Sequence, residues 1–301
     1  MLKLWPTLLL LTLCFKPLGS LGAEPLRWVS LSPAMTQMIV ESGGGKYLIG
    51  VTRYCRWPDG SESPPTRVGG ALDPDLEIIF SLRPDRVIAG SLLPHDTQRK
   101  LERLGIPVTL FRQNSLADVI DQMSWIQREL EGSLSSSSGS LNGATHEYLE
   151  DLRKRWQTSA DASPHPSRRV RALMVFSSGM EIAAGAQSYG AEILNAAGWV
   201  NASDTLAGAW PSPGREWLLK EDPDWLVLAT HQPRSETEEI KRKALERWRA
   251  DRLLSRLEAV RHGRVLVVGD NVLGVPGAGL FEVIDQLKLA RQHAERSDHD
   301  F

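Results

Sequence analysis

Two segments of the chain share one sequence pattern, and this repeat restricts the folds that the chain can adopt. The segments are "DPDLEIIFSLRPDRVIA" (73–89) and "SPGREWLLKEDPDWLVLA" (212–229). In each, a glutamate follows a helix-capping residue after four positions, and Pro-Asp follows the glutamate after seven. An apolar run comes next. Each copy therefore predicts a helix, a turn and a core strand, so two related lobes are expected.

A capping residue and a proline mark the start of each predicted helix. Asp73 and Ser212 are the expected N-caps, because their side-chain oxygens can accept hydrogen bonds from the first free backbone N–H groups. Pro74 and Pro213 are expected at the first helical position, where the missing N–H of proline costs nothing.

Strand-like and helix-like segments alternate along the rest of the chain. The strand-like runs lie at 27–31, 47–52, 86–90, 108–111, 170–176, 225–230 and 264–270. This β-α-β alternation predicts parallel sheets with helices on their faces. The predicted fold class is α/β, with two lobes that each hold a mostly parallel sheet flanked by helices, bridged by one long helix.

The predicted parts are a signal peptide (1–23), an N-terminal α/β lobe (24–112), a bridging helix (113–160) and a C-terminal α/β lobe (161–301). Within the bridging helix, the segment "GSLSSSSGSLNGA" (132–144) is polar and low in complexity. Such a segment buries too little apolar surface to order itself, so a disordered break is expected there.

The first 23 residues have the composition of a secretory signal peptide. Lys3 precedes an apolar stretch from Leu8 to Phe15, and small residues follow as far as Ala23. The order is typical of a cleaved signal, although the same residues could form an N-terminal helix of the fold. We expect a periplasmic protein whose exported form keeps one cysteine, Cys55, and no internal disulfide.

The charge balance and the missing motifs exclude several classes of protein. The 301 residues include 35 Lys and Arg and 37 Asp and Glu, without the basic excess of a nucleic-acid-binding protein. No apolar run reaches the roughly 18 residues of a membrane-spanning helix. The seven histidines show no zinc-ligand spacing, and neither H-E-x-x-H nor G-x-S-x-G occurs. We therefore expect no catalytic residues, no resident metal and no cofactor.

Glu77 and Glu216 stand at the same place in the two copies of the repeat. An acidic residue in the first turn complements the helix dipole, which is a sufficient reason for either glutamate alone. A matched pair on a two-lobed protein instead suggests a docking surface with two basic counterparts. Both interpretations stay open at this point.

Six segments together resemble a known family. In chain order they are "RWVSLSPAMTQMI", "LIGVTRYCRWP", "VGGALDPDLEIIFSLRPDRVIA", "SYGAEILNAAGWVN", "SPGREWLLKEDPDWLVL" and "GDNVLGVPGAGLFEVIDQL". They resemble the periplasmic substrate-binding proteins of ABC transporters for iron-siderophore complexes, haem and cobalamin. The resemblance implies a ligand held between two α/β lobes. It also implies that one glutamate of each lobe pairs with arginines of the permease, and Glu77 and Glu216 occupy those positions.

Loop residues at the carboxyl ends of strands are the candidate ligand-binding residues, because ligands of open α/β sheets bind there. The loop "RYCRWP" supplies Arg53, Tyr54 and Trp57. Aromatic faces suit a flat macrocycle or catechol rings, and arginines suit an anionic chelate. Trp57 could instead pack on the lobe surface, and Arg53 and Arg56 could instead face solvent.

Two further candidates lie in the second half of the chain. By resemblance to the cobalamin-binding members, Tyr54, Trp210 and Asp270 match positions that line the cleft. The tryptophan that those members carry near "VGGA" is replaced here by glycines. Trp210 could also pack the lobe surface, and Asp270 could cap the turn before the last helix.

Two function classes follow. The first is an exported monomeric binding protein that captures a cobalamin-like corrinoid, haem or a ferric siderophore and delivers it to the permease subunits of an ABC transporter. The second is an exported α/β hydrolase with the cleft as its active site. They differ in whether a nucleophile and a base are present, and the sequence shows no such set.

Overall fold

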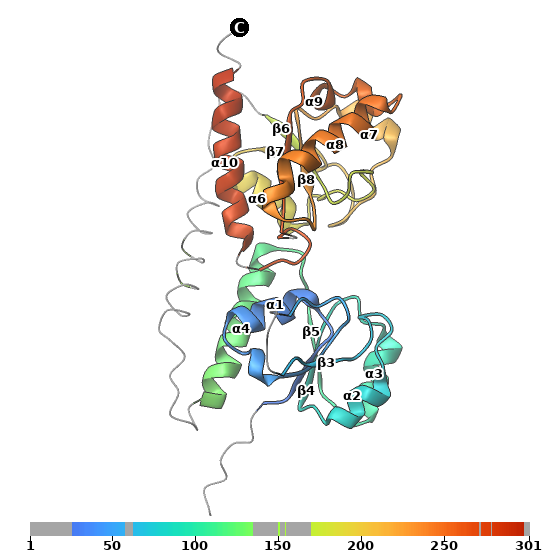
Figure 1. Ribbon diagram of the computed structural model, residues 1–301, viewed down its shortest axis with the longest axis vertical. Coiled ribbons are helices and arrows are strands. Elements are labelled where there is room, and N and C mark those ends of the chain that lie inside the picture. The colour runs from blue at the N-terminus through green and yellow to red at the C-terminus, as the bar shows by residue number, and fades with distance from the viewer. Residues whose placement is uncertain are drawn as a thin grey trace, which may run out of the picture.

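The structure, a computed structural model, shows two lobes, one above the other in Figure 1. The N-terminal lobe is the lower one, and the C-terminal lobe is the upper one. Among the helices that the structure describes, none is both long enough and apolar enough to cross a membrane. The described residues are 26–57, 63–134, 150, 154, 170–270, 272–277 and 279–297.

The N-terminal lobe contains a five-stranded sheet in the order β3-β2-β1-β4-β5, and every pairing in it is parallel. Its strands are β1 (Trp28–Ser30), β2 (Leu48–Val51), β3 (Thr66–Arg67), β4 (Arg86–Gly90) and β5 (Val108–Phe111). Its helices are α1 (Pro33–Glu41), η1 (Gly45–Tyr47), α2 (Leu76–Leu82), α3 (His95–Arg103) and α4 (Leu116–Leu134).

The C-terminal lobe contains a four-stranded parallel sheet in the order β7-β6-β8-β9. Its strands are β6 (Arg171–Val175), β7 (Val200–Asn201), β8 (Trp225–Ala229) and β9 (Val265–Val268). Its helices are α6 (Tyr189–Ala196), α7 (Arg215–Glu221), η2 (Arg234–Glu236), α8 (Thr237–Ala250), η3 (Leu254–Arg256), α9 (Glu258–Arg261) and α10 (Gly279–Ser297). Two parallel sheets flanked by helices confirm the predicted α/β fold class.

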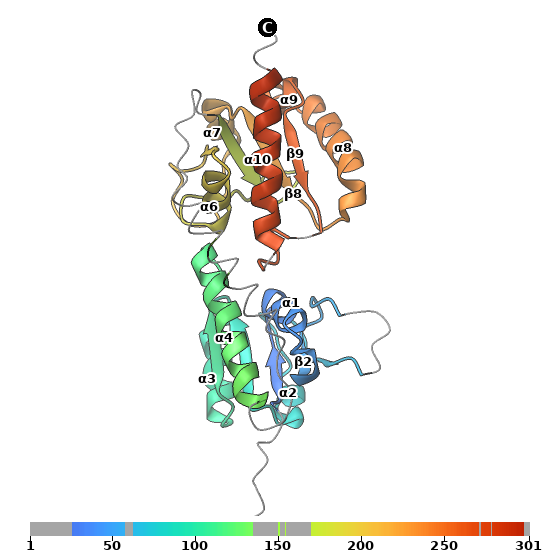
Figure 2. The same cartoon turned by 90° about the vertical axis from the view of Figure 1, so that its left-hand side faces the viewer.

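Both faces of the N-terminal sheet are covered by helices. Trp28 and Ile88 belong to the core beneath α1 and α4, whereas Val29 and Val87 belong to the core beneath α2 and α3. Successive residues of a strand point to opposite faces, so a strand buried on both faces is apolar throughout. Figure 2 shows α4 and α10 crossing the N-terminal and the C-terminal sheet on the same side of the molecule.

Helix α4 lies within the predicted bridge at 113–160. Leu116, Val119 and Ile126 join a core that also contains Ile193 of α6 and Ile284 of α10, so this core is continuous between the lobes. The helix continues through Leu134, past the position at which the sequence predicted a break. The rest of the predicted polar break, residues 135–144, lies outside the described residues, as does the predicted signal peptide.

A carboxylate of the C-terminal lobe caps the first turn of α4. The backbone N–H of Leu116 donates a hydrogen bond to Oε2 of Glu192 in α6, with 2.6 Å between the atoms. Burial raises the pKa of the Glu192 carboxyl, and the nearby charge of Asp118 adds to the rise, while the bond from Leu116 acts against it. The cap therefore joins the lobes through a half-buried carboxyl oxygen.

Replacing Glu192 by glutamine should remove one source of pH-dependent stability. A carboxyl whose pKa is raised by folding binds its proton more tightly in the folded chain, so stability is lost as pH rises from the ordinary value of 4.5 through the raised pKa. Glu192→Gln keeps an acceptor for the Leu116 N–H without the charge. We expect a flatter profile of melting temperature against pH, with Glu238→Gln on the exposed face of α8 as the control. An unchanged profile would contradict this.

The repeat forms helices α2 and α7, but the expected caps are wrong. Helix α2 begins at Leu76, and the Asp75 side chain accepts the hydrogen bond from Ile78 N at 3.0 Å. The carboxylate of Asp73 instead lies 2.5 Å from the Arg53 guanidinium. A tertiary ion pair therefore replaces the local cap that the sequence predicted.

The second copy departs from the prediction in the same way. Helix α7 begins at Arg215 after Gly214, which offers no side-chain cap. The Ser212 hydroxyl donates a hydrogen bond to the carbonyl of Glu181 at 2.5 Å. Pro213 therefore precedes the helix, as Pro74 precedes α2, and both helices start two residues later than their cap-proline pairs suggested.

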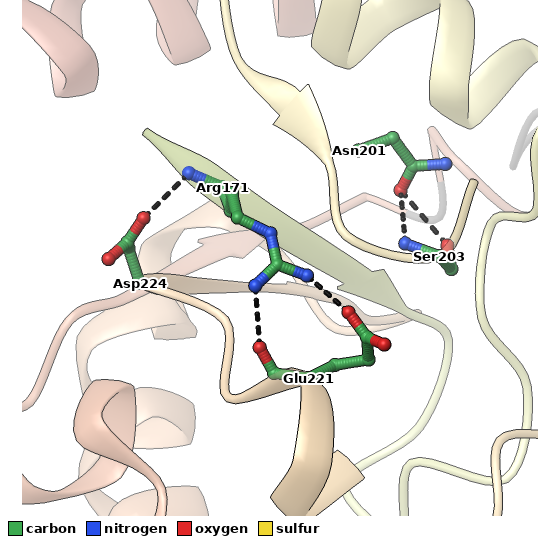
Figure 3. A network of polar contacts seen from close by, with 5 residues as sticks. All are labelled: Arg171, Asn201, Ser203, Glu221 and Asp224. Carbon is green, nitrogen blue, oxygen red and sulfur yellow. Dashed lines mark hydrogen bonds and ion pairs between the residues drawn. The ribbon is translucent and has the colours of Figure 1, made fainter. Parts of the chain in front are cut away.

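In the C-terminal lobe, the end of the repeat is tied to the first strand. Asp222 ends α7 in the left-handed region at φ 38°, and Asp224 accepts a hydrogen bond from the Arg171 backbone N–H at 2.8 Å. The Arg171 guanidinium donates to the carbonyl of Glu221 at 2.6 Å and also binds the Glu221 carboxylate (Figure 3). The Arg171 side chain therefore provides a hydrogen-bond donor for a free carbonyl at the end of α7, and Asp224 holds the start of β6.

The N-terminal lobe repeats this arrangement. Arg83 ends α2 at φ 48°, Asp85 accepts from the backbone N–H of Arg27 at 2.8 Å, and the Arg27 guanidinium donates to the carbonyl of Leu82 at 2.7 Å. In each lobe, an arginine at the start of the lobe therefore makes equivalent contacts with the end of the repeated segment. Both arginines lie far from the repeated segments in sequence. The two lobes are related in their contacts as well as in their order of elements.

Replacing Asp224 by alanine should lower the free energy of unfolding by about 1–3 kcal/mol, because the part-buried Arg171 N–H loses the carboxylate that accepts its hydrogen bond. The same change at Asp85, which is exposed, should cost less because water can replace the carboxylate. Urea unfolding of both variants checks the order. A larger loss for Asp85→Ala than for Asp224→Ala would contradict this account.

Candidate ligand-binding cleft

A cleft of about 820 Å³ lies between the lobes. Its walls come from segments that follow the carboxyl ends of β1, β2, β4 and β5 in one lobe and of β6, β8 and β9 in the other. Parallel sheets place their ligand sites at this edge, and the volume is within the usual range for small-molecule sites. The cleft is therefore the candidate functional site.

An aromatic cluster forms the wall in the C-terminal lobe. The Trp210 ring lies 5.2 Å from that of Phe176, edge to face, and 4.7 Å from that of Tyr189, measured between centroids. The Tyr189 hydroxyl donates a hydrogen bond to the carbonyl of Leu273, and burial raises the pKa of this phenol. Tyr189 is therefore a neutral, fixed support for the Trp210 face that lines the cleft.

The opposite wall carries Tyr54 and Arg56, which follow β2. The Tyr54 side chain is 65% exposed, which is unusual for a tyrosine that packs for stability alone. Arg56 donates a hydrogen bond to the carbonyl of His231 in the other lobe at 3.2 Å. The loop after β2 and the loop after β8 therefore approach each other across the cleft.

The structure brings Tyr54 and Trp210 to the cleft, but it does not bring the other three predicted ligand-binding residues there. Arg53 lies over the Tyr54 ring, 5.3 Å from its centroid, and pairs with Asp73. Trp57 packs against the core of the N-terminal lobe. Of the three residues predicted from this loop, Tyr54 alone lines the cleft.

Asp270 likewise lies outside the lining of the cleft. It adopts the left-handed region at φ 59°, and its carboxylate Oδ2 lies 3.0 Å from Nε of Arg234. It therefore ties the segment after β9 to the segment after β8. A direct contact of Asp270 with ligand stays a prediction.

Phe176, Tyr189 and His231 are among the lining residues that sequence reasoning missed. Phe176 and His231 follow the ends of β6 and β8 by one and two residues, so their position after a predicted strand was the available signal. Tyr189 is the first residue of α6, and no sequence motif indicates that its side chain lies at the cleft.

Glu77 and Glu216 are both exposed. Each is the second residue of its helix, in α2 and in α7. Both helices lie on the side of the molecule away from α4 and α10 (Figure 1). Docking to a permease stays a prediction.

Residues 29–272 match the sequence model of the periplasmic binding protein family. The chain belongs to this family. It is 26% identical over 219 residues to the cobalamin-binding protein of Halobacterium salinarum, a match that covers 71% of this chain and 57% of that relative. The chain thus spans little more than half the length of this relative.

Two solved structures share the fold of this periplasmic binding protein. The periplasmic vitamin B12 binding protein BtuF of Vibrio cholerae matches with a TM-score of 0.68 at 21% identity, covering 89% of this chain and 97% of that one. A periplasmic haem-binding protein of Pseudomonas aeruginosa matches with a TM-score of 0.68 at 26% identity, covering 88% and 92%.

These matches are to binding proteins rather than to enzymes. They confirm the predicted class and give no support to the alternative of an α/β hydrolase.

Proposed function

We propose that the protein captures a chelated metal or a corrinoid in the inter-lobe cleft and delivers it to the permease subunits of an ABC importer. The observation that carries the proposal is the aromatic lining contributed by both lobes, with Tyr54 on one wall and Trp210 on the other. A large, flat ligand can contact both faces at once, which a small polar solute cannot.

The polar groups of the cleft narrow the ligand class. Arg56 has a backbone carbonyl as its hydrogen-bond acceptor and no carboxylate partner among the described residues. A ligand with an anionic substituent would complement this charge. Haem, a ferric siderophore and a cobalamin-like corrinoid each combine an extended body with such substituents, and relatives named for cobalamin or haem binding support the class.

The delivery step rests on the two lobes acting together. A ligand held between lobes can be released when the two lobes are held apart, and Glu77 and Glu216 offer one exposed carboxylate on each lobe. We propose that these carboxylates meet basic residues of the permease. The export of the protein as a periplasmic monomer, through a signal peptide at residues 1–23, belongs to the same proposal.

The absorbance spectrum of the protein after incubation with a ligand tests this proposal. Separate samples are incubated with cyanocobalamin, haemin and a ferric siderophore, and free ligand is removed by gel filtration. We expect at least one coloured complex at one ligand per chain. Elution of a colourless protein from all the samples would contradict the proposed ligand class.

A further inference from the structure

One segment of the C-terminal lobe is unusually rich in arginine. The segment "RWRADRLLSRLEAVRHGR" (247–264) holds six arginines against two acidic residues, so its net charge is +4 with the histidine neutral, whereas the whole chain carries −2. It contains the end of α8, η3, α9 and the residue before β9. Four of its exposed arginines form what we call the arginine surface: Arg249, Arg252, Arg256 and Arg261.

The arginine surface rests on a well-packed part of the lobe. Helix α8, η3 and α9 contact one another, and Trp248, Leu254 and Leu257 belong to one buried core. Nε of Arg249 donates a hydrogen bond to the carbonyl of Val260 in α9 at 3.4 Å. Arg249 of α8 therefore lies beside α9, and the buried side chains hold the backbone that carries the arginines in place.

The first acidic residue of the segment, Asp251, is engaged elsewhere. Its carboxylate accepts hydrogen bonds from the backbone N–H groups of Leu253 and Leu254 at 2.9 and 3.1 Å, and it lies 2.8 Å from the guanidinium of Arg215 in α7. The bonds from the Leu254 and Leu253 backbone are the main causes of a lowered pKa of Asp251. Asp251 therefore stays ionised and pairs with Arg215 rather than with the arginine surface.

The second acidic residue, Glu258, pairs within its own helix. Its Oε1 lies 2.6 Å from the guanidinium of Arg261. By contrast, Arg252 and Arg256 have no hydrogen-bond or ion-pair partner in the part of the chain that the structure describes. Their positive charges are therefore available to an anionic partner.

The arginine surface lies outside the ligand-binding cleft. Segments after the carboxyl ends of the strands line the cleft, whereas α9 leads into the amino end of β9. Figures 1 and 2 both show α9 at the end of the C-terminal lobe that is farthest from the N-terminal lobe. None of the four arginines lines the cleft, so a partner bound to them would leave the ligand site open.

We propose that the arginine surface binds the anionic headgroups of a phospholipid membrane. The inference goes beyond the proposed function, because it concerns another surface and does not depend on the ligand of the cleft. A guanidinium matches a phosphate group through two parallel hydrogen bonds. Clusters of about four to eight basic residues beside a membrane are typical of proteins that recognise anionic lipids.

The apolar residues of the segment favour a lipid surface over a protein partner. Protein interfaces usually have an apolar centre inside a polar rim. The large apolar side chains that are exposed in the described residues all lie outside 247–264. A membrane surface presents many phosphate groups at once, so it can engage exposed arginines through charge without an apolar contact.

The arginine surface also adjoins the helix for which permease docking is proposed. Asp251 pairs with Arg215, and Arg215 directly precedes Glu216 in α7. Weak binding to the membrane would raise the concentration of the protein beside a permease in that membrane. The lipid contact itself needs no permease, so vesicles of lipid alone can test it.

Binding of the full chain to vesicles of two compositions tests this inference. One vesicle contains phosphatidylcholine alone, and the other contains equal parts of phosphatidylcholine and the anionic lipid phosphatidylglycerol. Flotation over a range of lipid concentrations gives a dissociation constant for each. We expect a preference for the anionic vesicle that declines with added salt, because salt screens exposed charges beyond about 8 Å at physiological ionic strength.

A double variant with a matched control assigns the preference to the arginine surface. Arg252→Gln with Arg256→Gln should reduce the preference roughly 20-fold, at about fivefold for each arginine near an anionic surface. Both side chains are exposed, so the melting temperature should be unchanged. Arg103→Gln with Arg112→Gln removes the same charge from two exposed arginines of the N-terminal lobe, and it should bind like the original protein.

Several results would overturn the inference. They are equal affinity for the two vesicles, a preference that survives in Arg252→Gln with Arg256→Gln, and an equal loss in the control, which would assign the effect to net charge. Competition by a low concentration of inorganic phosphate would instead indicate a site for a free anion. None of these results changes the ligand titrations that test the proposed function, so the two proposals can fail separately.

A protein partner is the remaining outcome that would contradict a lipid site. In that case, Arg252→Gln with Arg256→Gln would keep the preference for anionic vesicles. The same variant would lose association with the permease in nanodiscs of phosphatidylcholine alone.

Discussion

Replacing both Glu77 and Glu216 by lysine should abolish ligand uptake through the permease while leaving ligand affinity unchanged. Both carboxylates are exposed at the second position of their helices, and neither lines the cleft. If basic residues of a permease face them, the double reversal places like charges across the contact, which costs several kcal/mol. Association measured with permease in nanodiscs, together with uptake in cells, checks this result.

The control for this prediction is an acidic residue in an equivalent local setting. Glu238 lies in the first turn of α8, so Glu238→Lys alters the same helix-dipole interaction without changing α2 or α7. Uptake should be normal in that variant. If the double lysine variant also supported normal uptake, Glu77 and Glu216 would be partners of the helix dipole, worth a few tenths of a kcal/mol, and nothing more.

Removing an aromatic face from the cleft should weaken ligand binding by about 1–3 kcal/mol for either Tyr54→Ala or Trp210→Ala. Tyr54 is largely exposed, so its loss should leave the fold intact. Trp210 also packs on Phe176 and Tyr189, so its loss should lower stability as well. Calorimetric titration with the ligand that gives a coloured complex checks the affinities.

Two milder variants keep this prediction testable if Trp210→Ala unfolds. Trp210→Phe retains a ring for packing but reduces the face offered to a ligand, and it should still weaken binding. Trp57→Phe is the matched control, because Trp57 packs against the core and does not line the cleft. Stronger weakening in Trp57→Phe than in Trp210→Phe would show that the cleft has been placed wrongly.

The order of strands and helices could be predicted because it depends on local patterns. Strands buried on both faces, such as β4 and β8, are continuous apolar runs, and the alternation with helices implies parallel sheets. The helix caps could not be predicted as well. Asp73 has the chemistry of a cap, but its ion pair with Arg53, twenty residues away, decides its position.

Long-range pairings were the part of the fold that local patterns could not show. Asp85 binds the backbone of Arg27 and Asp224 binds that of Arg171, across 58 and 53 residues. The Pro-Asp pairs were visible in the sequence, but the arginines that they meet stand outside the repeated segments. The relation between the lobes therefore extends further than the repeat itself.

The sequence predicts where strands end, and therefore which loops lie at the cleft, but it does not predict which side chains of those loops face the cleft. Tyr54 and Trp210 lie in loops that the fold class places at the cleft, and the structure brings both to it. Trp57 and Asp270 come from the same kinds of loop, but their side chains turn toward the core and toward Arg234. The direction of a loop side chain depends on such tertiary contacts, and the sequence carries no local signal of them.

Tryptophan fluorescence during titration with chelated metals and corrinoids tests the central claim most directly, because Trp210 lies in the wall of the cleft. We expect saturable quenching, at one ligand per chain, by at least one of haemin, cobalamin and a ferric siderophore. In Trp210→Phe, which keeps nine of the ten tryptophans as reporters, half-maximal quenching should need a higher ligand concentration, whereas Trp57→Phe should be nearly unchanged. Quenching by none of these ligands, or a larger loss of affinity in Trp57→Phe than in Trp210→Phe, would contradict the account.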